Sequence, residues 1–81
     1  MGEIHTPEIV RNDIDVSVNV YSHPMTEEHH IQFIEAYTPD KKYLYLKFLE
    51  ANDEPVFKLS DIPKDIQAIE FCNIHGLWGS K

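Results

Sequence analysis

A cysteine and a histidine stand three residues apart near the end of the chain, as Cys72 and His75. At this spacing one short turn can present a sulfur and an imidazole nitrogen to the same point. Cys72 is the only cysteine among the 81 residues, so it cannot form an intrachain disulfide, nor complete a Cys₄ or Cys₂His₂ zinc site. A metal held by this pair would therefore need mostly non-sulfur ligands. The sequence offers four upstream imidazoles: His5, His23, His29 and His30.

The segments that must position these residues have the pattern of β-strands. From residue 14 to residue 20, apolar side chains at every second position (Ile14, Val16, Val18 and Val20) alternate with polar ones, which predicts a half-buried strand. Residues 1–12 show no clear period, and residues 26–35 are the best of the weak candidates for a helix. Short strands separated by turns predict an all-β sandwich or barrel. The further strands that we expect lie at residues 31–37, 43–49, 55–59 and 66–72.

Composition narrows the class of protein. The chain is 42% hydrophobic, which is ordinary for a globular protein, and its net charge is −7 with seven dispersed basic residues. This charge argues against a surface that binds nucleic acid. Neither a bilayer-spanning run nor a signal peptide is visible, so we expect a soluble, cytoplasmic protein with a reduced thiol. Residues 1–81 are expected to form one domain, small enough to gain stability from a metal or from oligomerisation.

The histidines differ in their expected placement. His23 and His29 fall at junctions between loops and strands, where side chains from distant parts of a sandwich can converge. His30 follows His29 directly and should point to the opposite face of a strand, so it is expected to stay out of a shared site.

Several motifs together resemble one known family. They are Gly2-Glu3-Ile4-His5-Thr6-Pro7, His23-Pro24-Met25, Glu28-His29, and Cys72-Asn73-Ile74-His75-Gly76-Leu77-Trp78. This set closely resembles the superoxide reductases, which comprise the neelaredoxins and the iron domain of the desulfoferrodoxins. The likeness runs from residue 2 to residue 78, and its terminal motif is the most specific part. With one cysteine, these residues cannot form the additional Cys₄ iron centre of desulfoferrodoxins.

The resemblance implies a seven-stranded, immunoglobulin-like β-sandwich that carries a mononuclear non-haem iron (Fe²⁺/Fe³⁺). By position in the motifs, the equatorial imidazoles would be His5, His23, His29 and His75, and the axial thiolate would be Cys72. Glu3 would be a removable sixth ligand. The implied activity is the one-electron reduction of superoxide to hydrogen peroxide, with rubredoxin or a similar carrier as the electron donor. Relatives are commonly dimers or tetramers, so a homo-oligomer is expected.

The sequence departs from the family pattern at one position. Ile4 occupies a position where the family often has lysine, so steering of superoxide is expected to be weaker.

Three alternative functions remain open. They are an iron protein that only carries electrons, a β-sandwich that a structural metal such as zinc stabilises, and a metal-free interaction module. An open sixth coordination position would distinguish the enzyme from a carrier or a structural zinc site.

Overall fold

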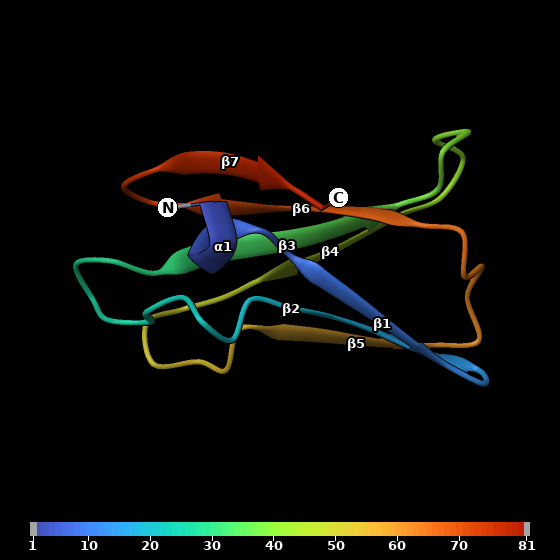
Figure 1. Ribbon diagram of the computed structural model, residues 1–81, viewed down its shortest axis with the longest axis horizontal. Helices are drawn as coiled ribbons and strands as arrows, with labels where there is room; N and C mark the ends of the chain where they lie inside the picture. Colours follow the sequence, from blue (N-terminus) through green and yellow to red (C-terminus); the bar gives the residue numbers. More distant parts are fainter. Residues whose placement is uncertain (1, 81) are drawn as a thin grey trace.

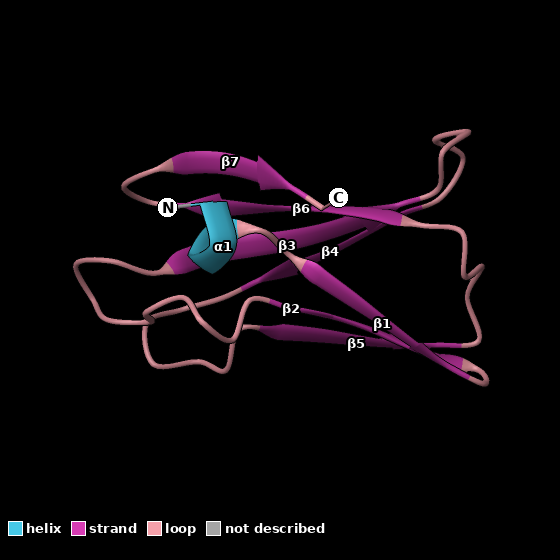
Figure 2. Ribbon diagram, in the orientation of Figure 1, coloured by secondary structure: helices cyan, strands magenta, loops and turns pink. Residues whose placement is uncertain are grey.

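The computed structural model describes residues 2–80, with side chains from residue 4 onward, and shows seven antiparallel strands in two facing sheets (Figures 1 and 2). The three-stranded sheet has the order β1-β2-β5 and the four-stranded sheet has the order β4-β3-β6-β7. This arrangement confirms the predicted all-β sandwich. The strands are β1 (Glu8–Asn12), β2 (Asp15–Asn19), β3 (Ile31–Tyr37), β4 (Leu44–Phe48), β5 (Val56–Ser60), β6 (Gln67–Cys72) and β7 (Gly76–Gly79).

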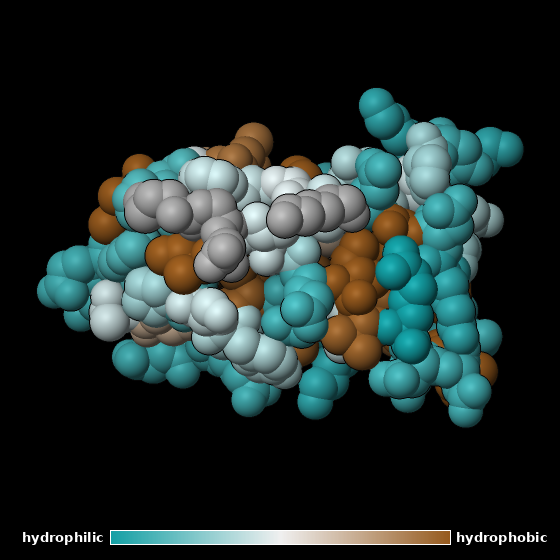
Figure 3. Space-filling view, viewed as in Figure 1, coloured by the Kyte–Doolittle hydropathy of each residue, from teal (hydrophilic) through white to brown (hydrophobic). Residues whose placement is uncertain are grey.

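The core lies between the sheets and follows the predicted alternation in most strands. Val16 and Val18 of β2 face Ile34 and Ala36 of β3, and all four are buried. In the space-filling view, apolar side chains show between the sheets, and hydrophilic ones cover most of the right-hand end (Figure 3). Burial of these aliphatic side chains is the main force that holds the sheets together. The prediction for Ile14 is wrong: it lies in the β1–β2 turn and is 64% exposed.

A β-bulge changes the face on which β3 begins. The register of β3 against β6 shifts between Ile31 and Phe33. Ile31 is consequently fully buried in the core, whereas Phe33 stacks on Phe71, 5.5 Å between ring centroids, on the other side of the sheet. Strict alternation along the strand expected at residues 31–37 would place Ile31 and Phe33 on the same face. The bulge inserts an extra residue and reverses that alternation.

Three elements of the structure were not predicted. The strand β1 is mostly exposed, so no buried stripe marks it in the sequence. The strand β7 is only four residues long and overlaps the terminal motif. The third element is α1 (Gly2–His5), a single helical turn at one end of the sandwich. No helix within residues 2–80 is long and apolar enough to cross a membrane.

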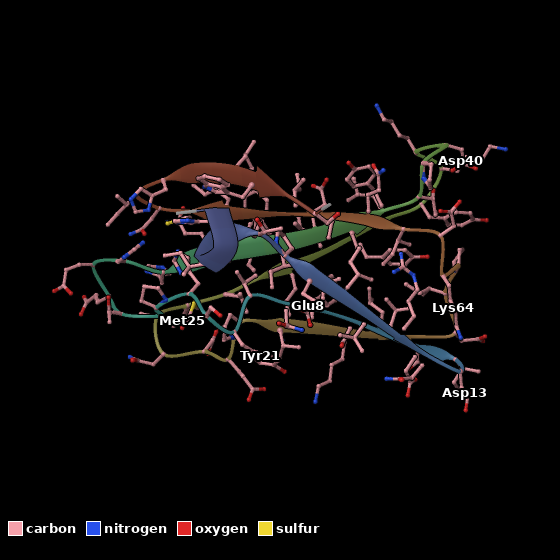
Figure 4. All side chains as sticks on the ribbon, viewed as in Figure 1. Glu8, Asp13, Tyr21, Met25, Asp40 and Lys64 are labelled. Carbon is pink, nitrogen blue, oxygen red and sulfur yellow. The ribbon has the colours of Figure 1, made fainter. Side chains whose placement is uncertain are left out.

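Three segments meet at one end of the sandwich: α1, the loop from residue 20 to residue 30, and the β6–β7 turn (Figure 1). Met25 lies in that loop, and Figure 4 places Asp13, Asp40 and Lys64 at the opposite end of the molecule. Segments far apart in the sequence therefore gather at the α1 end.

Candidate metal site

Five of the histidine and cysteine residues lie together at the α1 end, carried by the three segments that meet there. His5 ends α1, His23 and His29 lie in the loop between β2 and β3, Cys72 ends β6, and His75 lies in the β6–β7 turn. His5, His23 and Cys72 are buried, His29 is half-buried and His75 is exposed. The site therefore sits at the end of the sandwich, with one side toward solvent.

The four imidazoles form a closed ring. Neighbouring ring centroids are 4.8 Å apart for His5 and His23, 4.7 Å for His23 and His29, 5.0 Å for His29 and His75, and 4.7 Å for His75 and His5. The diagonal between His5 and His29 is 6.4 Å. The four nearly equal edges and the longer diagonal are those of a roughly square ring of imidazoles, which is the kind of arrangement that ligands of one ion require.

For four of these residues the distances between nitrogen and sulfur atoms agree with ligands of a single ion, whereas His23 joins them through its ring contacts with His5 and His29. His5 Nε2 lies 3.0 Å from His75 Nδ1, and Cys72 Sγ lies 3.7 Å from the same Nδ1. One donor atom each from His5, His29, Cys72 and His75 fits within 4.8 Å. Metal–imidazole bonds of about 2.1 Å at right angles would separate two nitrogens by about 3.0 Å. The His5–His75 distance matches this edge.

Two buried nitrogens support the fit to a metal ion. The Nε2 atoms of His23 and His29 are buried and have no hydrogen-bond partner within the described part of the chain. Buried polar atoms rarely stay unpaired in native proteins, so such atoms call for a ligand. His23 Nδ1 lies 2.6 Å from the carbonyl oxygen of Pro24. If Nδ1 donates its proton to this carbonyl, Nε2 carries the lone pair that a metal requires.

Burial also favours the neutral imidazole form that binds metals. The pKa of His23 is lowered chiefly by burial, against the opposing effect of the Pro24 carbonyl, and further by the neighbouring imidazoles of His29, His5 and His75. The pKa of His75 is lowered by loss of hydration and then by His5 and His29. Both rings therefore resist protonation above their lowered pKa values, and fewer protons compete with a metal there.

Local contacts hold the loop that carries His23 and His29. Thr26 and His29 exchange backbone hydrogen bonds of 2.9 and 3.2 Å, and the Thr26 hydroxyl donates to the His29 carbonyl over 3.1 Å. The backbone N–H of Asn52 donates to the Met25 carbonyl over 2.7 Å. These bonds form a tight turn that presents His29 toward Cys72.

A tryptophan braces the α1 side of the site. The Trp78 ring stacks on the His5 imidazole, 4.7 Å between centroids at an interplanar angle of 17°. Its indole N–H donates to the His75 carbonyl over 3.2 Å. Trp78 therefore contacts a candidate ligand at each end of the chain.

The remaining candidates lie elsewhere or cannot be placed. His30 stays out of the ring, and its Nδ1 lies 3.0 Å from the Thr26 carbonyl oxygen. The Glu3 side chain lies outside the described residues. Sequence reasoning overlooked Asn73, which bonds the loop next to His29, and Glu70, which is fully buried beside Cys72 on β6. Glu70 falls on the inward face of residues 66–72, so the alternation contained a signal for its burial.

Comparison with known proteins gives one consistent family. The family model for desulfoferrodoxin matches residues 1–81. A desulfoferrodoxin homolog of Archaeoglobus fulgidus is 39% identical over 80 residues, which is 96% of this chain but 62% of that protein. A superoxide reductase of Pyrococcus horikoshii is 33% identical, covering 95% of this chain and 84% of that protein.

A solved structure shows the same fold. The superoxide reductase from Treponema pallidum matches with a TM-score of 0.80 and 34% identity, over 98% of this chain and 65% of that one. The chain thus spans less than two thirds of the Archaeoglobus and Treponema proteins. The family-model match across all 81 residues, together with the shared fold, shows that the chain belongs to the desulfoferrodoxin family.

Proposed function

We propose that this domain binds a mononuclear non-haem iron and reduces superoxide by one electron to hydrogen peroxide. The observation that carries the proposal is the closed square of imidazoles beside a buried thiol. The four histidines of the ring and Cys72 would hold the iron. The Pyrococcus and Treponema proteins, which are named superoxide reductases, support the activity by similarity.

The donor set suits this chemistry. Four neutral imidazoles and one thiolate would leave a ferrous site with a net charge near +1, which attracts a small anion even in an acidic chain. Five protein donors leave one of six positions open for that anion. The iron would supply the one-electron couple. The thiolate of Cys72 donates electron density, and its burial keeps water away from the sulfur. We propose Glu3 as a removable sixth ligand.

The proposal is tested by loading the protein with iron and supplying superoxide together with a reductant. We expect about one hydrogen peroxide per superoxide consumed and no evolution of oxygen, because the reaction is a reduction. Oxygen release in step with peroxide would instead show dismutation. Protein from iron-supplemented cells that holds stoichiometric zinc, and that consumes no superoxide once loaded with iron, would point to a structural metal site.

The electron donor and the location follow from the same chemistry. We propose that a small one-electron carrier such as rubredoxin reduces the site, since one electron is needed for each superoxide. We also propose a cytoplasmic location, because Cys72 must stay reduced to act as a ligand and cytoplasmic thiols are kept reduced.

We further propose that the domain forms a homodimer through the outer face of the four-stranded sheet. Leu44, Leu46 and Phe48 of β4 and Leu77 of β7 are 59%, 42%, 73% and 61% exposed. The cross-strand row Leu77–Phe71–Phe33–Phe48 makes this apolar face continuous. With the half-buried aromatic rings, the face offers roughly 500–600 Å². Two copies would bury roughly 1,000–1,200 Å² in total, near the lower limit for a stable interface.

The face carries little charge to oppose such packing. Glu35 lies on it and borders a hollow of about 290 Å³, which Lys41, Tyr37, Tyr43, Leu44 and Ile69 also line. Exposed large apolar side chains are normally scattered singly over a protein surface, whereas four of them are grouped here on one face of a small domain. A second copy of the same face supplies a matching apolar surface with two-fold symmetry.

Phe48→Lys is expected to convert a dimer to a monomer, because each copy would bring an unpaired ammonium into the interface. Sedimentation equilibrium of the iron-loaded protein measures the mass. Ile14→Lys is the matched control, since it makes the same change at an exposed apolar residue of the β1–β2 turn and should leave the dimer intact. A monomeric wild type, or a Phe48→Lys protein with the mass of the wild type, would contradict this interface.

A further inference from the structure

We propose that Asn73 is a positioning residue for the candidate metal site, and that it acts through His29. Asn73 occupies the turn between Cys72 and His75, yet its side chain bonds the loop on both sides of His29. Its Oδ1 accepts a hydrogen bond from the His30 backbone N–H over 3.0 Å, and its Nδ2 donates to the Glu28 carbonyl over 3.0 Å. The Asn73 backbone N–H also donates to the His30 carbonyl over 3.1 Å.

These three bonds join two ligand-bearing segments that are more than 40 residues apart in sequence. A side-chain amide offers an acceptor and two donors in one plane, so it can bond a carbonyl and an N–H of the same strand-like segment at once. Here the two bonded groups belong to Glu28 and His30, the residues that flank His29. The bonds therefore fix the backbone from which the His29 imidazole projects.

The consequence for metal binding is that the His29 imidazole is held in position before an ion arrives. The loop of His23 and His29 reaches the site through turns, and the described residues make no strand pairing within positions 21–30. Without the Asn73 amide, the Glu28–His30 segment keeps one of its three bonds to the β6–β7 turn. His29 would then sample positions away from Cys72, and a bound ion would lose this ligand more often. Residues that orient metal ligands are typically worth about 10–100-fold in affinity.

This inference rests on the proposed ligand set, but it does not depend on superoxide chemistry. The test measures the loss of Co²⁺ from the loaded protein to an excess of chelator. We expect Asn73→Ala to release Co²⁺ about 10-fold faster than wild type. Asn73→Asp should fall between them, because a carboxylate still accepts from His30 but cannot donate to Glu28. Asn12→Ala, which removes the same amide at the far end of β1, should match wild type.

A double-mutant cycle separates positioning from a general loosening of the fold. In a His29→Ala background, Asn73→Ala should change the release rate by less than about 2-fold, because the residue through which it acts is gone. In a His5→Ala background it should keep its full effect, since the Asn73 side chain makes no hydrogen bond to α1 within the described residues. Equal effects in the wild-type and His29→Ala backgrounds would overturn the inference.

A second measurement requires no bound metal, so it tests the inference even when a variant takes up little Co²⁺. Hydrogen exchange of the His30 amide in the protein as purified should be at least about 10-fold faster in Asn73→Ala, but close to wild type in Asn73→Asp, which retains the acceptor. Unchanged exchange in Asn73→Ala would overturn the inference. A wild-type protein that takes up no Co²⁺ would instead contradict the proposed metal site. The exchange rate of the His30 amide would still show whether Asn73 holds the loop next to His29.

Discussion

Replacing Cys72 with serine is expected to lower the rate of superoxide reduction by about 100-fold or more, since even the partners that orient metal ligands are worth about 10–100-fold. The buried sulfur of Cys72 lies 3.7 Å from His75 Nδ1 at the edge of the imidazole square. A serine hydroxyl has nearly the same size but stays protonated at neutral pH, whereas a coordinating thiol is deprotonated. The substitution therefore removes the anionic donor with little change in packing.

Three measurements on iron-supplemented preparations follow this change: iron content, the visible thiolate-to-iron band of the oxidised protein, and the rate of superoxide consumption. The band should disappear in Cys72→Ser even where iron is retained, because no sulfur remains to produce it. Ala68→Ser is a matched control, since Ala68 is buried on the same face of β6 and gains the same hydroxyl. A Cys72→Ser protein with an undiminished rate would rule out Cys72 as a ligand of the iron.

The sequence predicted the parts of the fold where burial and periodicity agree. In β2 and β6, every second side chain faces the core, so alternation located both strands. The prediction failed where local geometry changes the pattern. Ile14 is apolar but lies in a turn, and the bulge in β3 brings Ile31 inward. The edge strand β1 buries too little on either face to produce a stripe.

The motifs in the sequence named the residues of the candidate site, but the geometry of the site could be seen only in the folded structure. Neither the spacing of the histidines nor their flanking residues shows that the four rings form a square, because this depends on how α1, the loop and the β6–β7 turn meet. The role of Asn73 was hidden for the same reason. Its partners Glu28 and His30 are more than 40 residues away, and an asparagine in a turn is ordinarily explained by turn geometry alone.

Glu70 is a buried carboxyl group whose titration should affect stability strongly. Its side chain is fully buried, and both carboxylate oxygens lack a hydrogen-bond partner among the described residues. In the β-ladder it pairs with Ile34 on one side and with Trp78 on the other. Burial raises the pKa of Glu70 from its ordinary value of 4.5 to about 8. The folded protein at neutral pH therefore holds a proton that the unfolded chain would release.

The sign of the pH dependence follows from this proton. Below pH 4.5 the carboxyl group is protonated in both states, and its burial has the lowest cost. As the pH rises from 4.5 to 8, the unfolded chain loses the proton and the folded protein keeps it, so the free energy of unfolding falls. Above pH 8 both states are ionised and the loss is complete. A shift of this size corresponds to about 3 kcal/mol between pH 5.5 and pH 8.5.

Glu70→Gln should remove this dependence, since the amide is nearly the same shape and does not titrate. We expect the free energy of unfolding of Glu70→Gln, relative to wild type, to rise by about 3 kcal/mol between pH 5.5 and pH 8.5 in urea titrations. The difference between the two proteins isolates Glu70, because both keep the same histidines and both are measured after a chelator has removed any metal. Glu54→Gln changes an exposed carboxylate, so its free energy of unfolding should vary with pH as that of wild type does. Parallel curves for Glu70→Gln and wild type would mean that the buried carboxyl group ionises without a penalty. A domain of this size has only about 4–12 kcal/mol of stability, so a change of about 3 kcal/mol would clearly shift the midpoint of the urea titration.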